Sequence, residues 1–188
     1  MLKTRQLGIS FHCIKDDIKS VFLRYIAYAR YNIISQTNKV KGGNNIMNDS
    51  ERQELIKAAI DVKNNAYAPY SGYYVGAALL TDDGTVFTGT NVENSSFPVG
   101  VCAERSAFAA AVSKGHRKFK AICVTGTRNN NPLIGNDYCM PCGMCRQFMT
   151  EFCDGDFEII SAKSAEDFQV YTLSTLMPGA FMLFGTML

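Results

Sequence analysis

The first regular pattern of apolar positions begins near Ser50. Apolar side chains recur there every three or four residues, which predicts an amphipathic helix with one buried face. Ser50 and Gln53 fit a capping box at its start. The helix ends by Ala68, because Pro69 disfavours a helical residue before it and has no amide hydrogen to donate.

Later segments change between strand and helix periods. In chain order we predict a turn at 69–72, strands at 75–80 and 85–90, a helix at 103–114, a strand at 119–125, a loop at 127–138, a helix at 142–152, a strand at 157–160 and a short helix at 173–176. Asp82-Asp83-Gly84 is typical of a hairpin turn. A strand, helix, strand order requires a crossover and favours a parallel pair. We therefore predict a three-layer α/β domain with a mixed central sheet and helices on both faces.

Residues 1–46 differ from the rest in charge and pattern. They carry eight Lys or Arg and two Asp, a net charge of 8 − 2 = +6, whereas the remainder holds 11 basic and 15 acidic residues, a net charge of −4. Positions 18–28 suggest a helical stripe, and 36–45 have the composition of a linker. We interpret residues 1–46 as a dispensable basic extension, and residues 47–188 as the domain. The alternative is a helix that binds a membrane surface or a partner.

Composition narrows the possible partners and compartment. The mildly acidic body argues against an electrostatic grip on nucleic acid. No run of about 18 apolar residues is present, so we expect no membrane span. The chain opens without a secretory signal, and three of its seven cysteines cluster at 139, 142 and 145. Clustered thiols in a reducing compartment indicate metal binding or catalysis, so we expect a cytoplasmic protein.

Three cysteines have the pattern of a zinc site. Cys142 and Cys145 lie three residues apart, on one side of a helical turn, and Cys102 precedes another predicted helix. Helix N-termini favour thiolate over thiol. Zinc with three thiolates carries about −1 net charge, and a hydrogen bond from Arg105 or Arg146 to a sulfur would offset it.

Glu104 distinguishes a catalytic site from a structural one. Cys139 could supply a fourth sulfur and close the site, as structural zinc requires. Alone, Glu104 would be an ordinary acidic residue in a first helical turn. Beside three thiols and an open coordination position, its carboxylate could move the protons of a zinc-bound water, and we favour this interpretation. Asn91 and Glu93, at the end of a predicted strand, are alone a weak signal of ligand binding.

Two motifs together resemble the signature of the small, three-cysteine cytidine deaminases. They are Cys102-Ala103-Glu104-Arg105 and Pro141-Cys142-Gly143-Met144-Cys145-Arg146-Gln147. The resemblance covers about residues 49–181. It also includes Ala68-Pro69-Tyr70-Ser71, Val75-Gly76-Ala77-Ala78, Gly89-Thr90-Asn91-Val92-Glu93-Asn94 and Leu176-Met177-Pro178-Gly179-Ala180-Phe181.

The resemblance implies a cytidine deaminase-like fold and a role for each residue of the metal site. It assigns Cys102, Cys142 and Cys145 as Zn²⁺ ligands. It also implies that Glu104 takes a proton from the zinc-bound water during attack at C4 of a pyrimidine, and then delivers protons to N3 and the departing amine.

The resemblance also implies a nucleoside pocket. Asn91 and Glu93 would hold the ribose 3′-hydroxyl. Tyr73 occupies a position where the family often has a phenylalanine that stacks near the base. Phe181 matches an aromatic residue contributed by a neighbouring subunit, which implies a homotetramer with shared active sites.

The implied activity is zinc-dependent hydrolytic deamination of cytidine and deoxycytidine to uridine and deoxyuridine, with release of ammonia, in pyrimidine salvage. A deaminase of a cytidine-like nucleoside antibiotic such as blasticidin S is one alternative. A structural zinc-binding protein is an alternative of another class.

Overall fold

The structure is a computed structural model, and it describes residues 47–128 and 138–182. The predicted helix at 18–28, the linker at 36–45 and most of the predicted loop at 127–138 lie outside the described residues. The elements are α2 (Asp49–Val62), the 3-10 helix η1 (Lys63–Asn65), β1 (Tyr73–Thr81), β2 (Val86–Thr90), the 3-10 helix η2 (Phe97–Val99), α3 (Ala103–Ser113), β3 (Phe119–Arg128), α4 (Gly143–Met149), β4 (Glu158–Ala162), β5 (Phe168–Thr172) and α5 (Leu173–Leu176).

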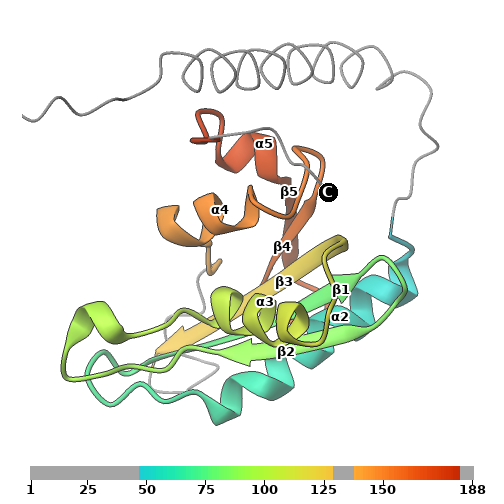
Figure 1. The fold of residues 1–188 in the computed structure, drawn as a ribbon. Coiled ribbons are helices and arrows are strands. Elements are labelled where there is room, and N and C mark those ends of the chain that lie inside the picture. The colour runs from blue at the N-terminus through green and yellow to red at the C-terminus, as the bar shows by residue number, and fades with distance from the viewer. Residues whose placement is uncertain (1–46, 129–137, 183–188) are drawn as a thin grey trace, which may run out of the picture. The chain divides into compact units, whose positions relative to one another are not determined.

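A five-stranded mixed sheet in the order β2-β1-β3-β4-β5 forms the middle layer (Figure 1). β1 is antiparallel to both β2 and β3, β3 is parallel to β4, and β4 is antiparallel to β5. The parallel pair flanks the crossover that contains α4, as a strand, helix, strand order requires. The predicted α/β class and mixed sheet are confirmed.

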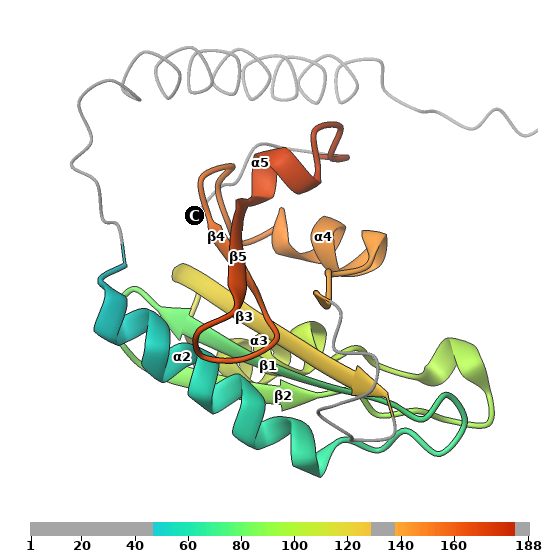
Figure 2. The ribbon, with the colours of Figure 1, turned by 180° about the vertical axis from the view of Figure 1, so that it is seen from behind.

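Each face of the sheet is covered by helices, which can be followed in Figures 1 and 2. On one face, α2 buries Leu55, Ile56 and Ala59 against the apolar residues of β1, β3 and β4. On the other face, α3 and α4 enclose a larger core around Phe108 of α3, whose ring contacts Phe148 and three other phenylalanines. The two helices that carry the cysteine motifs therefore share one core.

The start of α2 differs from the predicted capping box. Asn48 is the N-cap: its Oδ1 accepts a hydrogen bond from the Glu51 amide (2.9 Å), and the Glu51 carboxylate accepts one from the Asn48 amide (3.0 Å). Asparagine caps a helix as well as serine does. Ser50 lies within the first turn, and Gln53 instead donates to the Ala165 carbonyl (2.8 Å).

Other boundaries depend on tertiary contacts. β3 continues to Arg128, two residues into the predicted loop. α4 ends at Met149, because the Thr150 hydroxyl bonds the Gln147 carbonyl (2.7 Å) and competes with the helical pattern. β5 was not predicted at all. It is an edge strand paired only with β4 and has no buried residue, so its sequence lacks a buried alternation.

Gly89 of β2 allows α3 to pack directly on the sheet. A Cβ at this position would lie 2.3 Å from the Ala107 nitrogen and 2.5 Å from the Ala103 oxygen, both backbone atoms of α3. Real Cβ atoms do not approach backbone that closely, so a side chain here would displace the helix. Because α3 carries Cys102 and Glu104 at its start, this contact sets the height of both above the sheet.

We expect Gly89→Ala to lower the free energy of unfolding by about 1–3 kcal/mol, the range typical of overpacking. Gly179→Ala is the matched control, because a Cβ there has no atom within 4 Å. The control should range from unchanged to about 1 kcal/mol more stable. Thermal unfolding of both variants checks this, and equal stability of the two would contradict the close packing.

Candidate metal centre and nucleoside pocket

The structure brings three predicted ligand sulfurs together. The Sγ atoms of Cys102 and Cys142 are 4.0 Å apart, those of Cys142 and Cys145 are 3.6 Å apart, and all three lie within 4.8 Å of one another. A tetrahedral zinc with Zn–S bonds of about 2.3 Å separates its sulfurs by about 3.8 Å. The cluster therefore fits zinc in both donor type and spacing.

Two helix starts position these sulfurs. Cys102 is the N-cap of α3 and Cys142 the N-cap of α4, and neither side chain caps its own helix. Cys145 follows one turn into α4 and is buried. The amide hydrogens at each helix start place partial positive charge near the sulfurs, which favours the thiolate form.

Mutual contact makes the three thiols unequal as acids. A hydrogen bond from Cys145, helped by Arg105, lowers the pKa of Cys102 to about 5. The same hydrogen bond and burial raise the pKa of Cys145 above its ordinary value. The three-thiol cluster therefore loses its first proton easily, and ionisation of a second thiol costs free energy unless a cation binds the sulfurs. Zinc bound by the three sulfurs would supply that cation, and its binding would release the remaining thiol protons.

Either Arg105 or Arg146 was predicted to donate to a sulfur, and the structure shows that their contacts differ. Nη2 of Arg105 donates to the Gly100 carbonyl (3.4 Å) and to the Cys102 sulfur (3.9 Å). Arg146 instead donates to the backbone carbonyls of Pro141 (2.7 Å) and Leu176 (3.1 Å). Arg105 is therefore the arginine placed to offset the charge of the cluster.

Cys139 is separate from the three-sulfur cluster. Among the described residues, the group that can hold a metal contains Cys102, Cys142 and Cys145 only. Cys139 is buried, and its sulfur packs with the Tyr73 side chain over Gly126. Burial raises the pKa of the Cys139 thiol to about 11, which disfavours the thiolate that zinc would need. This geometry favours an open site over a closed four-sulfur one.

Glu104 lies in the first turn of α3 and is only 4% exposed. Burial raises the pKa of its carboxyl, and the neighbouring Cys102 thiolate raises it further. Cys145 acts in the opposite direction and lowers the pKa of this carboxyl. A buried carboxyl with a raised pKa beside a metal site is suited to accept and return protons near neutral pH.

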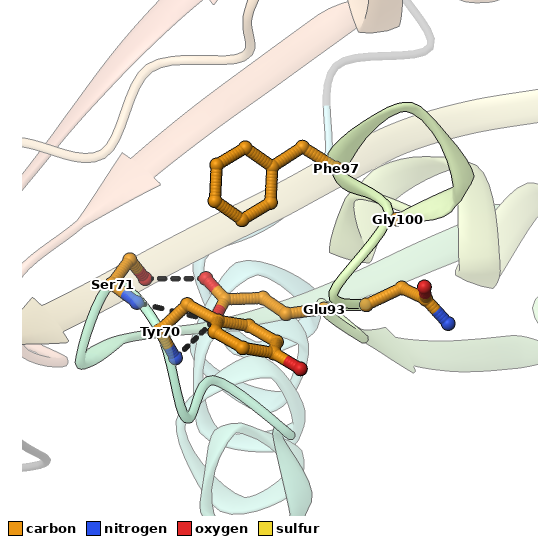
Figure 3. A pocket seen from close by; sticks show the side chains of 6 residues that line it. Tyr70, Ser71, Glu93, Phe97 and Gly100 are labelled. Atoms are coloured by element: carbon orange, nitrogen blue, oxygen red, sulfur yellow. Dashed lines mark hydrogen bonds between the residues drawn. The ribbon is translucent and has the colours of Figure 1, made fainter.

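A cavity of about 350 Å³ contains the second predicted carboxylate, Glu93 (Figure 3). Figure 3 shows the Glu93 carboxylate facing the turn at Tyr70 and Ser71, with the Phe97 ring nearby. The amides of Tyr70 and Ser71 donate to Oε2 (2.9 and 3.2 Å), and the Ser71 hydroxyl donates to Oε1 (2.5 Å). The Ser71 hydroxyl is the main cause of a lowered pKa at Glu93. Gly100 also lines the cavity.

Tyr73 begins β1, and Asn91 directly follows the neighbouring strand β2. The Asn91 side chain accepts from the Val75 amide (2.8 Å) and donates to the Tyr73 carbonyl (2.9 Å). These bonds fix its amide plane and leave one Nδ2 hydrogen for a ligand. The Tyr73 side chain packs against the core around Phe108 and over Gly126, so it does not belong to the lining of the cavity.

Phe181 lies apart from these groups within one chain, and its side chain is 71% exposed. Its backbone is bonded by the side chain of Gln147, in the same motif as the ligands. Sequence reasoning gave no role to Gln147 or to Ser71. Both stand inside recognised motifs, but only the folded chain shows that each binds a distant segment.

Comparisons with known proteins agree with this geometry. The family model for the cytidine and deoxycytidylate deaminase zinc-binding region matches residues 49–160. The chain belongs to this deaminase family. A probable cytidine deaminase from Dictyostelium discoideum is 42% identical over 72% of this chain and 86% of its own length. Cytidine deaminase from Halalkalibacterium halodurans is 45% identical over 70% of this chain and 94% of its own length.

Solved structures of deaminases match the fold as well. Cytidine deaminase from Burkholderia pseudomallei aligns with a TM-score of 0.61 and 42% identity, over 68% of this chain and 97% of the other. The enzyme from Mycobacterium tuberculosis aligns with a TM-score of 0.58 and 35% identity, over 69% and 96%. The predicted family, the cytidine deaminase-like fold and the predicted zinc cofactor are confirmed. Among the described residues, no helix has the length and apolarity to span a membrane.

We expect Cys142→Ala to lose zinc and Cys139→Ala to keep it. Removing one of three ligands should lower retained zinc from about one equivalent per chain to below about a tenth, after dialysis against a mild chelator. Metal analysis by atomic spectroscopy measures both variants. Zinc loss from Cys139→Ala, or full retention by Cys142→Ala, would contradict the assignment of ligands.

Proposed function

We propose that this chain is a zinc-dependent cytidine deaminase that hydrolyses cytidine and deoxycytidine to uridine and deoxyuridine with release of ammonia. One observation carries the proposal: three sulfurs spaced for zinc lie beside the buried carboxyl of Glu104, and the described residues offer no fourth ligand. Structural zinc takes four protein ligands, whereas catalytic zinc keeps a position open. The relatives named cytidine deaminase support the choice of substrate.

The reaction adds the oxygen of water to C4 of the pyrimidine and breaks the bond from C4 to the amine. Cys102, Cys142 and Cys145 would hold the zinc, which would supply Lewis-acid activation of water near neutral pH. Glu104 accepts a proton from the attacking water and gives it to N3. The same carboxyl then carries the second proton to the departing amine, which leaves as ammonia. Its raised pKa suits a group that must hold each proton briefly.

Glu93 and Asn91 would bind the sugar. The hydrogen bonds from the Ser71 hydroxyl and two backbone amides keep the Glu93 carboxylate ionised and fixed in orientation. An ionised carboxylate is a strong acceptor for a hydroxyl group, and the free Nδ2 hydrogen of Asn91 is a donor. This pair favours a free nucleoside, with its unmodified 3′-hydroxyl, over a polynucleotide.

We expect Glu104→Gln to retain zinc and to lower kcat for cytidine by about a hundredfold to ten-thousandfold, the contribution typical of general acid–base catalysis. The amide has the size of the carboxyl but accepts no proton. The decrease in ultraviolet absorbance on conversion of cytidine to uridine measures kcat, and metal analysis measures the zinc.

Wild-type turnover by Glu104→Gln would remove Glu104 from the mechanism. The same assay compares deoxycytidine and blasticidin S with cytidine. Faster turnover of blasticidin S than of cytidine would favour the antibiotic deaminase, and no turnover of any of them with zinc bound would favour a structural zinc protein.

The assembly we propose is a homotetramer with shared active sites, in the cytoplasm, acting in pyrimidine salvage. Phe97 and Phe181 are 76% and 71% exposed on one chain, so both large apolar residues are accessible to a neighbouring subunit. Phe97 lines the nucleoside cavity, so a neighbouring Phe181 could cover it. The unpaired thiols of the described cysteines suit a reducing compartment.

The deaminase domain that we propose is residues 47–188, with residues 1–46 dispensable. The relatives are covered for 86–97% of their length by about seven-tenths of this chain, and the family match starts at residue 49. We expect residues 47–188, expressed alone, to be soluble, to bind zinc, to deaminate cytidine and to sediment as four copies. Insoluble or inactive protein would contradict the domain boundary, whereas active monomers would contradict the shared sites.

A further inference from the structure

The side chain of Gln147 is fully bonded, and two of its bonds hold a distant backbone segment. Its Nε2 donates to the Phe181 carbonyl (2.6 Å), and its Oε1 accepts from the Phe181 amide (3.0 Å). The second Nε2 hydrogen goes to the Thr150 hydroxyl (3.0 Å). Since both hydrogens and the oxygen of the amide are engaged, its orientation is fixed. Both backbone polar groups of Phe181 are satisfied by this one side chain.

Gln147 belongs to α4, the helix that carries Cys142 and Cys145. The preceding residue, Arg146, donates to the Leu176 carbonyl at the end of α5 (3.1 Å). Two successive side chains of the metal-binding helix therefore hold the segment 176–181 at its two ends. The side chains of Arg146 and Gln147 therefore connect the segment that carries Phe181 to the metal-binding helix α4.

Leu176 and Met177 pack against the core around Phe108, but beyond Met177 little else fixes this segment within one chain. After Leu176 the described residues contain no further helix or strand. Phe181 is 71% exposed and Met182 40% exposed, so neither side chain is anchored in the core. A segment with little buried apolar surface has low local stability, so its hydrogen bonds decide where it lies. Gln147 provides two of these bonds.

We propose that Gln147 is a positioning residue for substrate binding, which holds the backbone of Phe181 so that its ring meets the nucleoside cavity of a neighbouring copy. The inference rests on the proposed function and on its shared sites. Gln147 acts through Phe181 and touches neither the metal nor the reacting atoms. Loss of the two hydrogen bonds from Gln147 to the Phe181 backbone therefore weakens nucleoside binding, so KM rises. It leaves the proton transfers by Glu104 unchanged, so kcat does not fall.

The test uses the full-length, zinc-loaded chain. Gln147→Met keeps the length and helix propensity of the side chain but removes its hydrogen bonds. Gln53→Met is the matched control: Gln53 also donates from Nε2 to a backbone carbonyl, that of Ala165 (2.8 Å), but from α2 on the opposite face of the sheet. We expect KM for cytidine to rise about tenfold in Gln147→Met, with kcat within about twofold, and to stay unchanged in Gln53→Met.

The double variant Gln147→Met/Phe181→Ala separates positioning from general stability. If Gln147 acts through Phe181, the double variant has the KM of Phe181→Ala alone, because the ring that Gln147 positions is already absent. An unchanged KM in Gln147→Met would overturn the proposal. So would a double variant whose KM rises by the product of the fold-changes seen in the two single variants. If Gln147→Met loses zinc or solubility, Gln147→Glu gives the same test: it keeps the acceptor for the Phe181 amide and should raise KM without lowering kcat.

Failure of the proposed function looks different. A wild-type chain that does not deaminate cytidine contradicts the activity itself, before any variant is compared. If the wild-type chain deaminates cytidine and Gln147→Met has the same KM, only the positioning role of Gln147 is contradicted.

Discussion

Repulsion among three thiolates is the constraint on which the site depends. Cys102, Cys142 and Cys145 are held with their sulfurs within 4.8 Å of one another, so the charge of one opposes ionisation of the next. The chain relieves this with two helix N-termini and with the guanidinium of Arg105. These groups stabilise a negative cluster only partly, and a divalent cation completes the balance. The fold holds the three sulfurs close together although their mutual repulsion costs free energy.

For the sulfurs to meet, the N-termini of α3 and α4 must lie side by side, although the strand β3 separates the two helices in the chain. α3 packs against β2 at Gly89, which has no side chain. α4 lies in the crossover that joins β3 to its parallel neighbour β4. The ring of Phe108 contacts residues of α4 and of the strands, so the two helix starts share one rigid core. The sulfur geometry is therefore a consequence of packing far from the metal, which is why a helix shift at Gly89 would be felt at Cys102.

Sequence patterns predicted the parts of this structure that depend on local chemistry. The helix starts at the cysteine motifs, the hairpin and the crossover all follow from spacing, turn residues and chain order. Two features were predicted wrongly. β5 exists because the distant strand β4 offers it an edge, and α4 stops early because the Thr150 hydroxyl bonds back to the Gln147 carbonyl three residues before it. Ser71 and Gln147 stood in recognised motifs without a role, since each acts on a residue more than twenty positions away. Local patterns do not encode such contacts.

Two carboxylates show how one fold separates two tasks. Glu104 is buried, and its burial together with the Cys102 thiolate raises its pKa towards the range where a proton can be taken and returned. Glu93 accepts three hydrogen bonds at a turn, and the Ser71 hydroxyl in particular lowers its pKa, so it stays ionised. Opposite pKa shifts in two groups of the same chemical type indicate different roles. A carboxyl that must exchange protons is kept dry beside the metal, and one that must only accept a hydroxyl is kept charged by fixed donors.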